Sequence, residues 1–474
     1  MKNNIGISIS NLGRVKNADI ELKPLTVFIG PNNTGKTWSA YLVYAIFHED
    51  WVSRVMIKTL DKKTVKTLIG KTAVELVMNN KAKIDLNFVL DQLNINEHFG
   101  KEFKNYFSKF MSCGPDYFDE LKISLKYDTA DIKDEFLEIK IHKIEIEIPS
   151  IKNREKIDIP PSINIIKEKN SNELILSIIS HDLIDKKLDK LTYFKEQIYN
   201  FIGIVFSFIT KQFFYEKLVI FPAERTALTY ISDDLVYRKF EKSSNVRIQK
   251  DLSDYEESDY EEPLYPKPIL DYIKLIRQIK NVSSKGIVDK KFVKLDTFLE
   301  KDILSGKVSI MKDEIGSRFI YEFGNKKLDL PITSSLVKDL AIFNLYLRYF
   351  AGEGDLVIID EPEMNLHPEA QAKLIELICI LVNKGIKFII TTHTPYIVDH
   401  LINLINAHGS GNKRIEKEFF LKSKEAFLSP DDLGVYLFNK DGEVADILDR
   451  EENTIDWETF GKVTQKVSDI YYKL

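Results

Sequence analysis

The sequence predicts an α/β fold with a mostly parallel core sheet, an antiparallel β subdomain and an inserted helical region. The apolar run 25–29 is followed by a glycine-rich turn and then by a helix-forming segment. Two further apolar runs of buried-strand type, 355–360 and 387–392, flank a predicted helix, which is the order of a parallel sheet. Residues 118–180 alternate apolar and polar side chains, and this pattern is typical of a half-buried antiparallel sheet.

The composition is that of a large globular chain with a mixed surface. Of its 474 residues, 44% are hydrophobic, which allows sizeable cores. The net charge of −5 gives no sign of a globally basic nucleic-acid binder, although a local basic face stays open. Cys113 and Cys379 lack metal-ligand spacing, so we expect reduced thiols in a cytoplasmic protein. No signal peptide or membrane span is recognisable, and no membrane partner is expected.

The first elements lead into a phosphate-binding pattern. Residues 5–21 alternate weakly and predict two antiparallel strands before the strand 25–29. Residues 30–37 then fit G-x-x-x-x-G-K-[ST], and 38–47 can continue as a helix. In this setting backbone N–H groups and the positive end of the helix face an anion. A glycine turn that happens to carry Lys-Thr is the alternative.

This loop predicts the binding of a nucleoside triphosphate. Lys36 would reach the β- and γ-phosphates, and Thr37 would be a ligand of Mg²⁺. The residues expected to contact the nucleotide in this segment are Gly30, Asn32, Asn33, Thr34, Gly35, Lys36, Thr37 and Trp38.

The region after the loop changes character several times. Residues 52–110 are expected to be mostly helical, and 185–215 to form a long helix after the antiparallel sheet. The basic stretch 58–71 is interpreted as a solvated helix face, with a nucleic-acid contact as the alternative. The acidic stretch 251–262 is interpreted as a solvated loop, with a docking surface for a partner as the alternative.

The middle of the chain returns to regular elements. A buried-type strand is predicted at 218–221, a helical stretch at 268–300, and a hairpin at 308–330 that turns near Gly324. A strand at 434–438 would be followed by a second hairpin and a final helix, 456–474.

A second candidate half of the site lies at the end of the strand 355–360. The carboxyl edge of a parallel sheet is where α/β folds bind ligands, and this strand ends in Asp360 and Glu361. Asp360 would hold Mg²⁺, and Glu361 would orient or deprotonate the attacking water. Because neighbouring residues on a strand point to opposite faces, Glu361 must lie just past the strand, in a turn with Pro362.

The next strand of this half ends in a histidine. A helix over 369–383 should end at Gly385, and the strand 387–392 should follow. His393 then lies at the same edge of the sheet, where it would contact the γ-phosphate. A structural histidine is the alternative.

The order of phosphate loop, Asp-Glu strand and His strand resembles the ABC-type ATPase head. ISNLGRVKNADIEL and LTVFIGPNN, within 5–50, resemble the soluble RecF, SMC and OLD-type branch. DEPEMNLHP and TTHTPY, within 330–405, resemble the OLD-like, AAA-type ATPase subunits of bacterial antiphage defence systems. The region between matches only in pattern. The resemblance implies a cytoplasmic ATPase that uses ATP and Mg²⁺ as a homodimer or higher homo-oligomer.

The resemblance also implies a signature segment that completes the site of a partner subunit. Residues 332–340 occupy that place, and Ser334 and Ser335 would bind the γ-phosphate across the dimer interface. Leu336 stands where the family has a glycine, and a simple serine helix cap is the alternative.

Residues 222–226 resemble the Q-loop of the family, with Glu224 where glutamine is usual. Glu224 would touch Mg²⁺ or the attacking water. Arg225 would hold a phosphate or bridge domains, and a buried ion pair is the equal alternative.

OLD-type nucleases append a TOPRIM domain, for which the segment after His393 is too short, so no nuclease is expected here. The resemblance predicts a sensor or regulatory subunit that controls a separately encoded effector, a nuclease or toxin. The alternatives are a RecF- or SMC-like repair ATPase that contacts DNA, and an ATP-locked scaffold with little turnover. Five parts are expected. The N-terminal head with the phosphate loop is 1–50, and the helical and antiparallel insertion is 51–215. The Q-loop strand with a helical lobe is 216–330, the C-terminal head is 331–410, and the hairpin with a helix is 411–474.

Overall fold

The computed structural model describes residues 5–85, 87–88, 91, 94–127, 141–147, 162–178, 215–231, 265–282, 292, 295–313, 316–412, 414–455, 466 and 468–472. The chain divides into two compact units. The larger unit consists of Gly6–Ala45, Lys104–Ser124 and Glu216–Leu474, and the smaller one of Met1–Ile5, Ile46–Phe103 and Leu125–Tyr215.

The larger unit is organised around a six-stranded sheet in the order β16-β15-β3-β14-β13-β9. The first five strands along the chain run parallel, and the edge strand β16 is antiparallel to β15. Their bounds are Leu25–Ile29 (β3), Leu218–Phe221 (β9), Leu356–Asp360 (β13), Lys387–Thr392 (β14), Leu433–Phe438 (β15) and Val444–Asp446 (β16). Every residue of β3 and β13 is buried, as expected for parallel strands covered on both faces. The predicted mostly parallel core sheet is confirmed.

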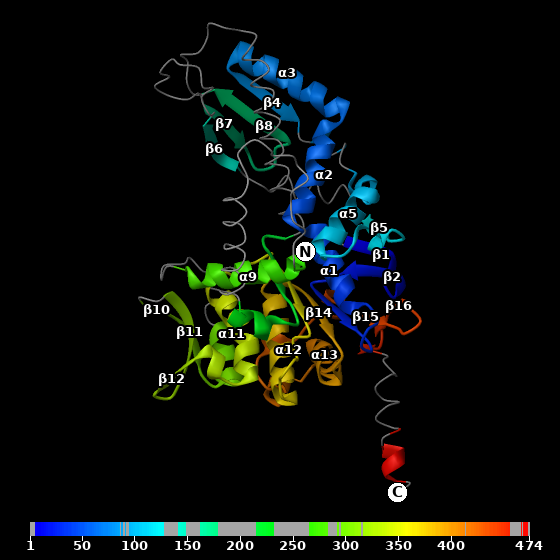
Figure 1. Ribbon diagram of the computed structural model, residues 1–474, viewed down its shortest axis with the longest axis vertical. Helices are drawn as coiled ribbons and strands as arrows, with labels where there is room; N and C mark the ends of the chain where they lie inside the picture. The colour runs from blue at the N-terminus through cyan, green and yellow to red at the C-terminus, as the bar shows by residue number, and fades with distance from the viewer. Residues whose placement is uncertain are drawn as a thin grey trace, which may run out of the picture. The chain divides into compact units, whose positions relative to one another are not determined.

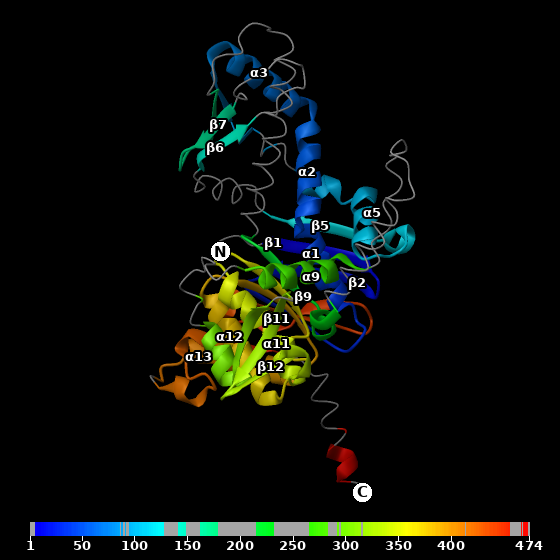
Figure 2. The same ribbon diagram turned by 60° about the vertical axis from the view of Figure 1, so that its left-hand side comes forward.

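Helices cover this sheet and supply much of its core. The helix α12 packs against β14 and against α13 (Figures 1 and 2). It begins one residue before the predicted start and ends at the predicted Asn383, and Gly385 follows it with a φ of +93°. The bounds are Lys36–Phe47 (α1), Lys101–Phe110 (α5), Lys267–Lys280 (α9), Leu295–Phe298 (α10), Ser335–Tyr349 (α11), Pro368–Asn383 (α12) and Pro395–His408 (α13), with a π-helical segment at Leu299–Leu304.

Two smaller three-stranded sheets belong to the larger unit. The strands β1, β2 and β5 form one sheet, and β10, β11 and β12 form another. The predicted hairpin with its turn at Gly324 is present as β11 and β12, but β10 extends it to three strands. The bounds are Ile5–Leu12 (β1), Val15–Leu22 (β2), Lys122–Lys126 (β5), Lys307–Asp313 (β10), Gly316–Phe323 (β11), Lys326–Asp329 (β12), Leu448–Asp449 (β17) and Thr454–Ile455 (β18).

The smaller unit combines two helices with an antiparallel sheet in the order β4-β8-β7-β6. Its elements are Glu49–Asp61 (α2), Lys63–Asn79 (α3), Lys81–Asp85 (β4), Ile141–Glu147 (β6), Ser162–Lys167 (β7) and Glu173–Ile178 (β8). The expectation that 52–110 is mostly helical is confirmed by α2, α3 and α5, and the strand β4 interrupts the helical stretch. Asn80 adopts a left-handed conformation with a φ of +53°, which ends α3, and the next five residues then alternate exposed and buried.

Some expectations fall on parts of the chain that the structure does not describe. The helix at 185–215 lies almost wholly outside the described residues, and the acidic stretch 251–262 lies wholly outside them. Of the final helix, residues 466 and 468–472 are described, and residues 466 and 468–471 are helical.

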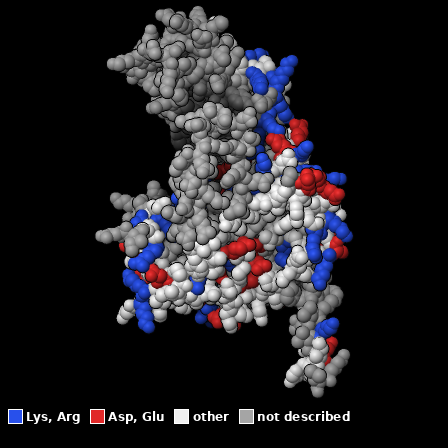
Figure 3. All heavy atoms as spheres, in the orientation of Figure 1, with Lys and Arg blue, Asp and Glu red and all other residues white. Residues whose placement is uncertain are grey.

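Charges of both signs share the surface. Lys and Arg side chains gather over β10–β12 together with acidic ones (Figure 3), and Arg318 lies within 3.1 Å of Asp313 and 3.2 Å of Asp329. In the predicted basic stretch, Lys62 pairs with Glu97 at 3.0 Å. The Lys62–Glu97 pair favours the solvated-face interpretation of the basic stretch. Among the described residues, no helix has both the length and the apolar character needed to cross a bilayer.

Candidate functional site

The loop between β3 and α1 depends on two glycines. Gly30 has a φ of +139°, and a Cβ atom there would lie 2.4 Å from the carbonyl oxygen of Phe438. Gly35 has a φ of +101°, and a Cβ atom there would lie 2.5 Å from Val15 Cγ2. Thr34 closes the turn, because its buried hydroxyl donates to the Pro31 carbonyl at 2.9 Å. Side chains are therefore excluded where the backbone must turn most tightly.

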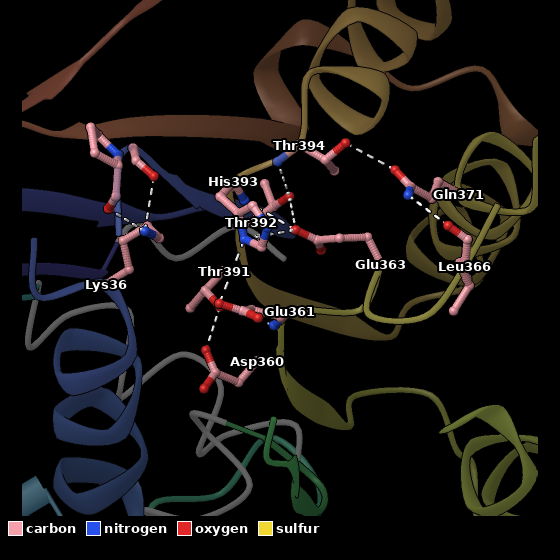
Figure 4. A network of polar contacts seen from close by, with 12 residues as sticks. Lys36, Asp360, Glu361, Glu363, Leu366, Gln371, Thr391, Thr392, His393 and Thr394 are labelled. Carbon is pink, nitrogen blue, oxygen red and sulfur yellow. Dashed lines mark hydrogen bonds and ion pairs between the residues drawn. The ribbon is translucent and has the colours of Figure 1, made fainter. Parts of the chain in front are cut away.

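Lys36 is turned back onto this loop. Its ammonium donates to the carbonyl oxygens of Gly30 at 2.9 Å and Pro31 at 2.7 Å (Figure 4). Burial lowers the pKa of Lys36, while the carboxylates of Glu361, Asp360 and Glu363 oppose that shift. The cation thus faces an acidic edge, and its two bonds to carbonyl oxygens can be exchanged for bonds to phosphate.

Thr37 and Asp360 meet although 323 residues separate them in the chain. The Thr37 hydroxyl donates to Asp360 Oδ1 at 3.0 Å, and the Thr391 hydroxyl donates to the same oxygen. Burial raises the pKa of Asp360 to about 6, and these two hydrogen bonds oppose the shift. A hydroxyl and a carboxylate in contact are hard oxygen donors, so the pair fits Mg²⁺, which takes few protein ligands beside phosphate and water.

Glu361 is the first residue past β13, as expected, because a residue next to Asp360 on the same strand would point to the opposite face of the sheet. It adopts a left-handed conformation with a φ of +50°, uncommon outside glycine. Its N–H donates to the backbone oxygen and to the hydroxyl oxygen of Thr391, both at 3.1 Å. Its side chain is 29% exposed, so the carboxylate is accessible to water.

Arg225 binds the backbone of this turn. The guanidinium donates to the carbonyl oxygens of Asp360 and Glu361, each at 2.8 Å, and more weakly to that of Pro222 at 3.3 Å. Only 2% of Arg225 is exposed. The sequence leaves open a phosphate contact, a domain bridge or an ion pair for Arg225, and the structure shows bonds to backbone carbonyl oxygens. A local pattern could not reveal this because the partners are more than 130 residues away.

His393 follows β14 and lies beside two carboxylates. Its Nδ1 is 3.6 Å from Glu361 Oε1 and 3.6 Å from Glu363 Oε1, and its side chain is 42% exposed (Figure 4). Glu363 is buried, and its Oε1 accepts from the Thr392 hydroxyl at 2.6 Å and from the His393 N–H at 3.0 Å. Sequence reasoning assigned no role to Glu363; its signal was the second acid of the Asp-Glu-Pro-Glu run.

Other predicted residues lie around this centre. Trp38 packs against Tyr117 and Phe118, with ring centroids 5.6 Å apart in both pairs, and Gly13 lies under its ring. Asn32 and Asn33 are exposed on the loop, and Asn33 has a φ of +63°. Glu224 is exposed but close enough for its charge to raise the pKa of Asp360.

The serine pair lies at the start of α11. Ser334 is its N-cap, with a hydroxyl that accepts from the Val337 N–H at 3.4 Å, and both serines are exposed. Among the described residues no polar contact connects Ser334 or Ser335 with the phosphate loop. Leu336, half-buried, packs against the hydrophobic core.

The family of this chain follows from a match over most of its length. A family model described as an AAA ATPase domain matches residues 3–398. The chain belongs to this family. The match contains the glycine loop, the Asp360 strand and His393, so both halves of the site are parts of the AAA ATPase domain. No curated protein matches the chain.

Three solved SMC head structures are similar to this AAA ATPase-domain chain. One is an SMC head bound to the C-winged helix domain of ScpA (11% identity, 83% of this chain and 90% of that chain covered, TM-score 0.31). Another, from Pyrococcus furiosus, carries an extended coiled coil and the C-terminal domain of ScpA (12%, 99% and 100%, TM-score 0.33). The third is from Thermotoga maritima (9%, 94% and 99%, TM-score 0.30). TM-scores this low carry no conclusion about activity or partners.

Proposed function

We propose that this chain is a Mg²⁺-dependent ATPase that hydrolyses ATP to ADP and phosphate. The observation that carries the proposal is the contact between Thr37 and Asp360, 3.0 Å apart across 323 residues. In this contact the Thr37 hydroxyl of the phosphate loop lies next to the buried Asp360 carboxylate, at the carboxyl edge of the parallel sheet. That pairing is what a magnesium–triphosphate requires.

Each group at this edge has a proposed part in hydrolysis. When bound, Mg²⁺ neutralises charge on the β- and γ-phosphate oxygens. Thr37 and Asp360 hold the ion, and Lys36 leaves its carbonyl partners to bind phosphate. Glu361 orients or deprotonates the attacking water, and His393 contacts the γ-phosphate. Catalysis then rests on positioning and on charge stabilisation, because in-line attack needs little covalent help from the protein.

Two substitutions separate binding from turnover. Lys36→Ala should weaken ATP binding by at least about tenfold, because the loop loses its only side-chain cation. Glu361→Gln should bind ATP normally and hydrolyse it at least about 100-fold more slowly, because the amide cannot take a proton from water. Calorimetry with Mg²⁺-ATP and a phosphate-release assay measure the two effects.

Exposed residues of the same types provide controls. Lys440→Ala and Glu451→Gln change charges on the surface and should leave both quantities unchanged. Normal hydrolysis by Glu361→Gln would contradict the mechanism, and tight binding by Lys36→Ala would contradict the site.

We further propose that ATP is bound between two copies of the chain, with Ser334 and Ser335 of one copy facing the Lys36 of the other. The exposure of both serines at the start of α11 supports this arrangement, since a helix N-terminus attracts phosphate. Within one copy the serines make no contact with the loop in the described chain, which is consistent with a site completed in trans.

The biological role is proposed from the resemblance of the DEPEMNLHP and TTHTPY segments. We infer a regulatory ATPase of an antiphage system, acting on a separately encoded nuclease or toxin. An effector gene beside the gene of this chain is expected, and a DNA-repair neighbourhood instead would contradict the defence role.

An ATP-locked scaffold is the second candidate, and one observation favours it. Leu336 occupies the glycine position of the signature segment and packs on the core, so the backbone there cannot approach a phosphate as a glycine would. Brisk hydrolysis by the purified wild type, without any partner, would exclude the scaffold.

A further inference from the structure

We propose that Glu363 is a positioning residue that holds His393 beside Glu361 during ATP hydrolysis; this inference rests on the proposed ATPase function. Glu363 lies two residues after Glu361 in sequence, and its carboxylate reaches toward Thr392 and His393 at the end of β14 (Figure 4). Its contacts are with the residues that carry the histidine rather than with the proposed ligands Thr37 and Asp360.

The contacts fix the backbone at the histidine. Glu363 Oε1 accepts the Thr392 hydroxyl at 2.6 Å and the His393 N–H at 3.0 Å. The same oxygen lies 3.6 Å from His393 Nδ1, and Glu361 Oε1 lies at the same distance. One buried oxygen therefore holds the His393 backbone and lies beside the edge of its ring.

A closed set of hydrogen bonds keeps Glu363 itself in place. The Thr394 N–H donates to Thr392 Oγ1 at 3.2 Å, and the Thr394 hydroxyl donates to Gln371 Oε1 at 2.9 Å. Gln371 Nε2 donates to the Leu366 carbonyl at 2.9 Å, and the Leu366 N–H donates back to the Glu363 carbonyl at 3.0 Å. Hydrogen bonds thereby connect the loop after β13, which carries Glu363, with the loop after β14, which carries His393.

The geometry assigns Glu363 the role of a hydrogen-bond acceptor. Its second oxygen, Oε2, is buried without a hydrogen-bond partner in the described chain, so only Oε1 holds the loop. A glutamine can present the same carbonyl oxygen to Thr392 and His393. Glu363→Gln should therefore keep the arrangement, whereas Glu363→Ala removes the acceptor and leaves two donors unmatched.

Glu376 offers a matched control with the same chemistry elsewhere. It is fully buried, and it accepts the backbone N–H groups of Phe420 at 3.0 Å and Leu421 at 2.7 Å. A histidine also contacts it, with His400 Nε2 at 2.8 Å. Glu376 has no contact with the phosphate loop or with His393 in the described chain, so its loss should affect folding stability without acting through His393.

The test is a double-mutant cycle on ATP hydrolysis with the full chain. Glu363→Ala should lower kcat by about 10- to 100-fold, as loss of a group that orients a catalytic residue does. The KM for ATP should change by less than about threefold, because the ground-state phosphate contacts remain. In a His393→Ala background, Glu363→Ala should change kcat by less than about twofold, since its target is already gone. Glu363→Gln should retain most of the wild-type kcat.

Thr392→Val provides a second variant if Glu363→Ala does not fold. It removes one donor to Oε1 and keeps a β-branched side chain in the strand. A partial loss of kcat that vanishes in the His393→Ala background is expected. For Glu376→Ala, any loss of kcat should be the same in both backgrounds.

Three outcomes would overturn the inference. In the first, the effects of Glu363→Ala and His393→Ala on kcat multiply in the double mutant, which would show that the two residues act independently. In the second, Glu363→Gln lowers kcat as much as Glu363→Ala does, which would indicate that the charge of Glu363 matters. A wild-type protein without Lys36-dependent hydrolysis would overturn the ATPase proposal as well, and the wild-type and Lys36→Ala assays identify that case separately.

Discussion

Arg225 and Glu361 show how single residues shape the turn at the end of β13. A left-handed residue other than glycine costs about 1–2 kcal/mol, and Glu361 adopts this conformation with a φ of +50°. Arg225 binds its carbonyl, and Thr391 binds its N–H, so the surrounding structure holds the turn. Such strain gathers at functional positions. Here the left-handed conformation places the Glu361 carboxylate just beyond the end of β13, so that it can lie on the same side as the Asp360 carboxylate.

Asp355 is a buried carboxylate at the opposite end of β13. It accepts the Tyr346 hydroxyl at 2.6 Å and the Gly352 N–H at 2.9 Å, while its Oδ1 is buried without a hydrogen-bond partner in the described chain. Burial raises the pKa of Asp355 to about 6, and the hydrogen bonds oppose the shift. The folded state therefore binds a proton more tightly than the unfolded state does.

This shift predicts a pH dependence of stability. Because the folded pKa exceeds the unfolded value of 3.8, the contribution of Asp355 is most favourable below about pH 4 and is lost as pH rises through about 6. A shift of about two units corresponds to about 3 kcal/mol between these limits. Urea unfolding of Asp355→Asn should lack this part of the pH dependence, whereas the exposed control Asp441→Asn should retain it. Parallel curves for wild type and Asp355→Asn would contradict the assignment.

At the scale of elements, α11 begins at a serine cap that stands apart from the phosphate loop. Ser334 accepts the Val337 N–H, and Ser335 is the first helical residue. The helix then enters the core at once, since Val337 and Leu340 are buried. The cap thus serves folding in one copy, and its exposed hydroxyls remain available for a second copy.

The two serines should differ in folding and agree in catalysis. Ser334→Ala should lower the free energy of unfolding by about 1 kcal/mol, because the first turn of α11 loses its acceptor. Ser335→Ala should leave stability nearly unchanged, because the cap of α11 is Ser334 and the Ser335 hydroxyl has no capping contact within the described part of the chain. If both bind phosphate in trans, both variants should lower ATP turnover. Thermal unfolding measures the effect on stability, and an ATP turnover assay measures the effect on catalysis. Unchanged turnover in both variants would contradict phosphate binding in trans and would leave helix capping as the role of Ser334.

For the molecule as a whole, the site depends on where the parallel sheet places remote segments. The strand β3 lies between β14 and β15, and β13 lies beyond β14, so the ends of 25–29, 356–360 and 387–392 share one edge. Whether a second copy of the chain completes this site can be tested by mixing two variants, without knowledge of the interface between the copies.

Mixing two inactive variants should restore activity if the site is shared. One partner carries Lys36→Ala and the other carries Ser334→Ala with Ser335→Ala. A random mixture of dimers regains at most about a quarter of the wild-type sites, because half of the dimers contain one intact site. Phosphate release before and after mixing measures this recovery. No recovery, in a mixture shown by native mass spectrometry to exchange subunits, would contradict the shared site.

The sequence by itself determined the parallel core and the candidate phosphate loop. Fully buried strands read as short apolar runs, and β3, β9, β13 and β14 lie within a residue of their predicted positions. Glycines that must turn with positive φ, and a lysine in fixed register after them, are likewise local features of the chain. Both kinds of signal depend only on neighbours in sequence, so they survive without knowledge of the fold.

Only the tertiary structure decided which remote groups meet. The strand β5 pairs with β1 instead of joining the predicted sheet over 118–180, and β4, a short strand within a region expected to be mostly helical, joins β8. Arg225 binds two carbonyl oxygens at the end of β13, and Glu363 holds the end of β14. Strand partners and hydrogen-bond partners are chosen by packing between distant segments, and a period or a motif in one segment carries no information about the other.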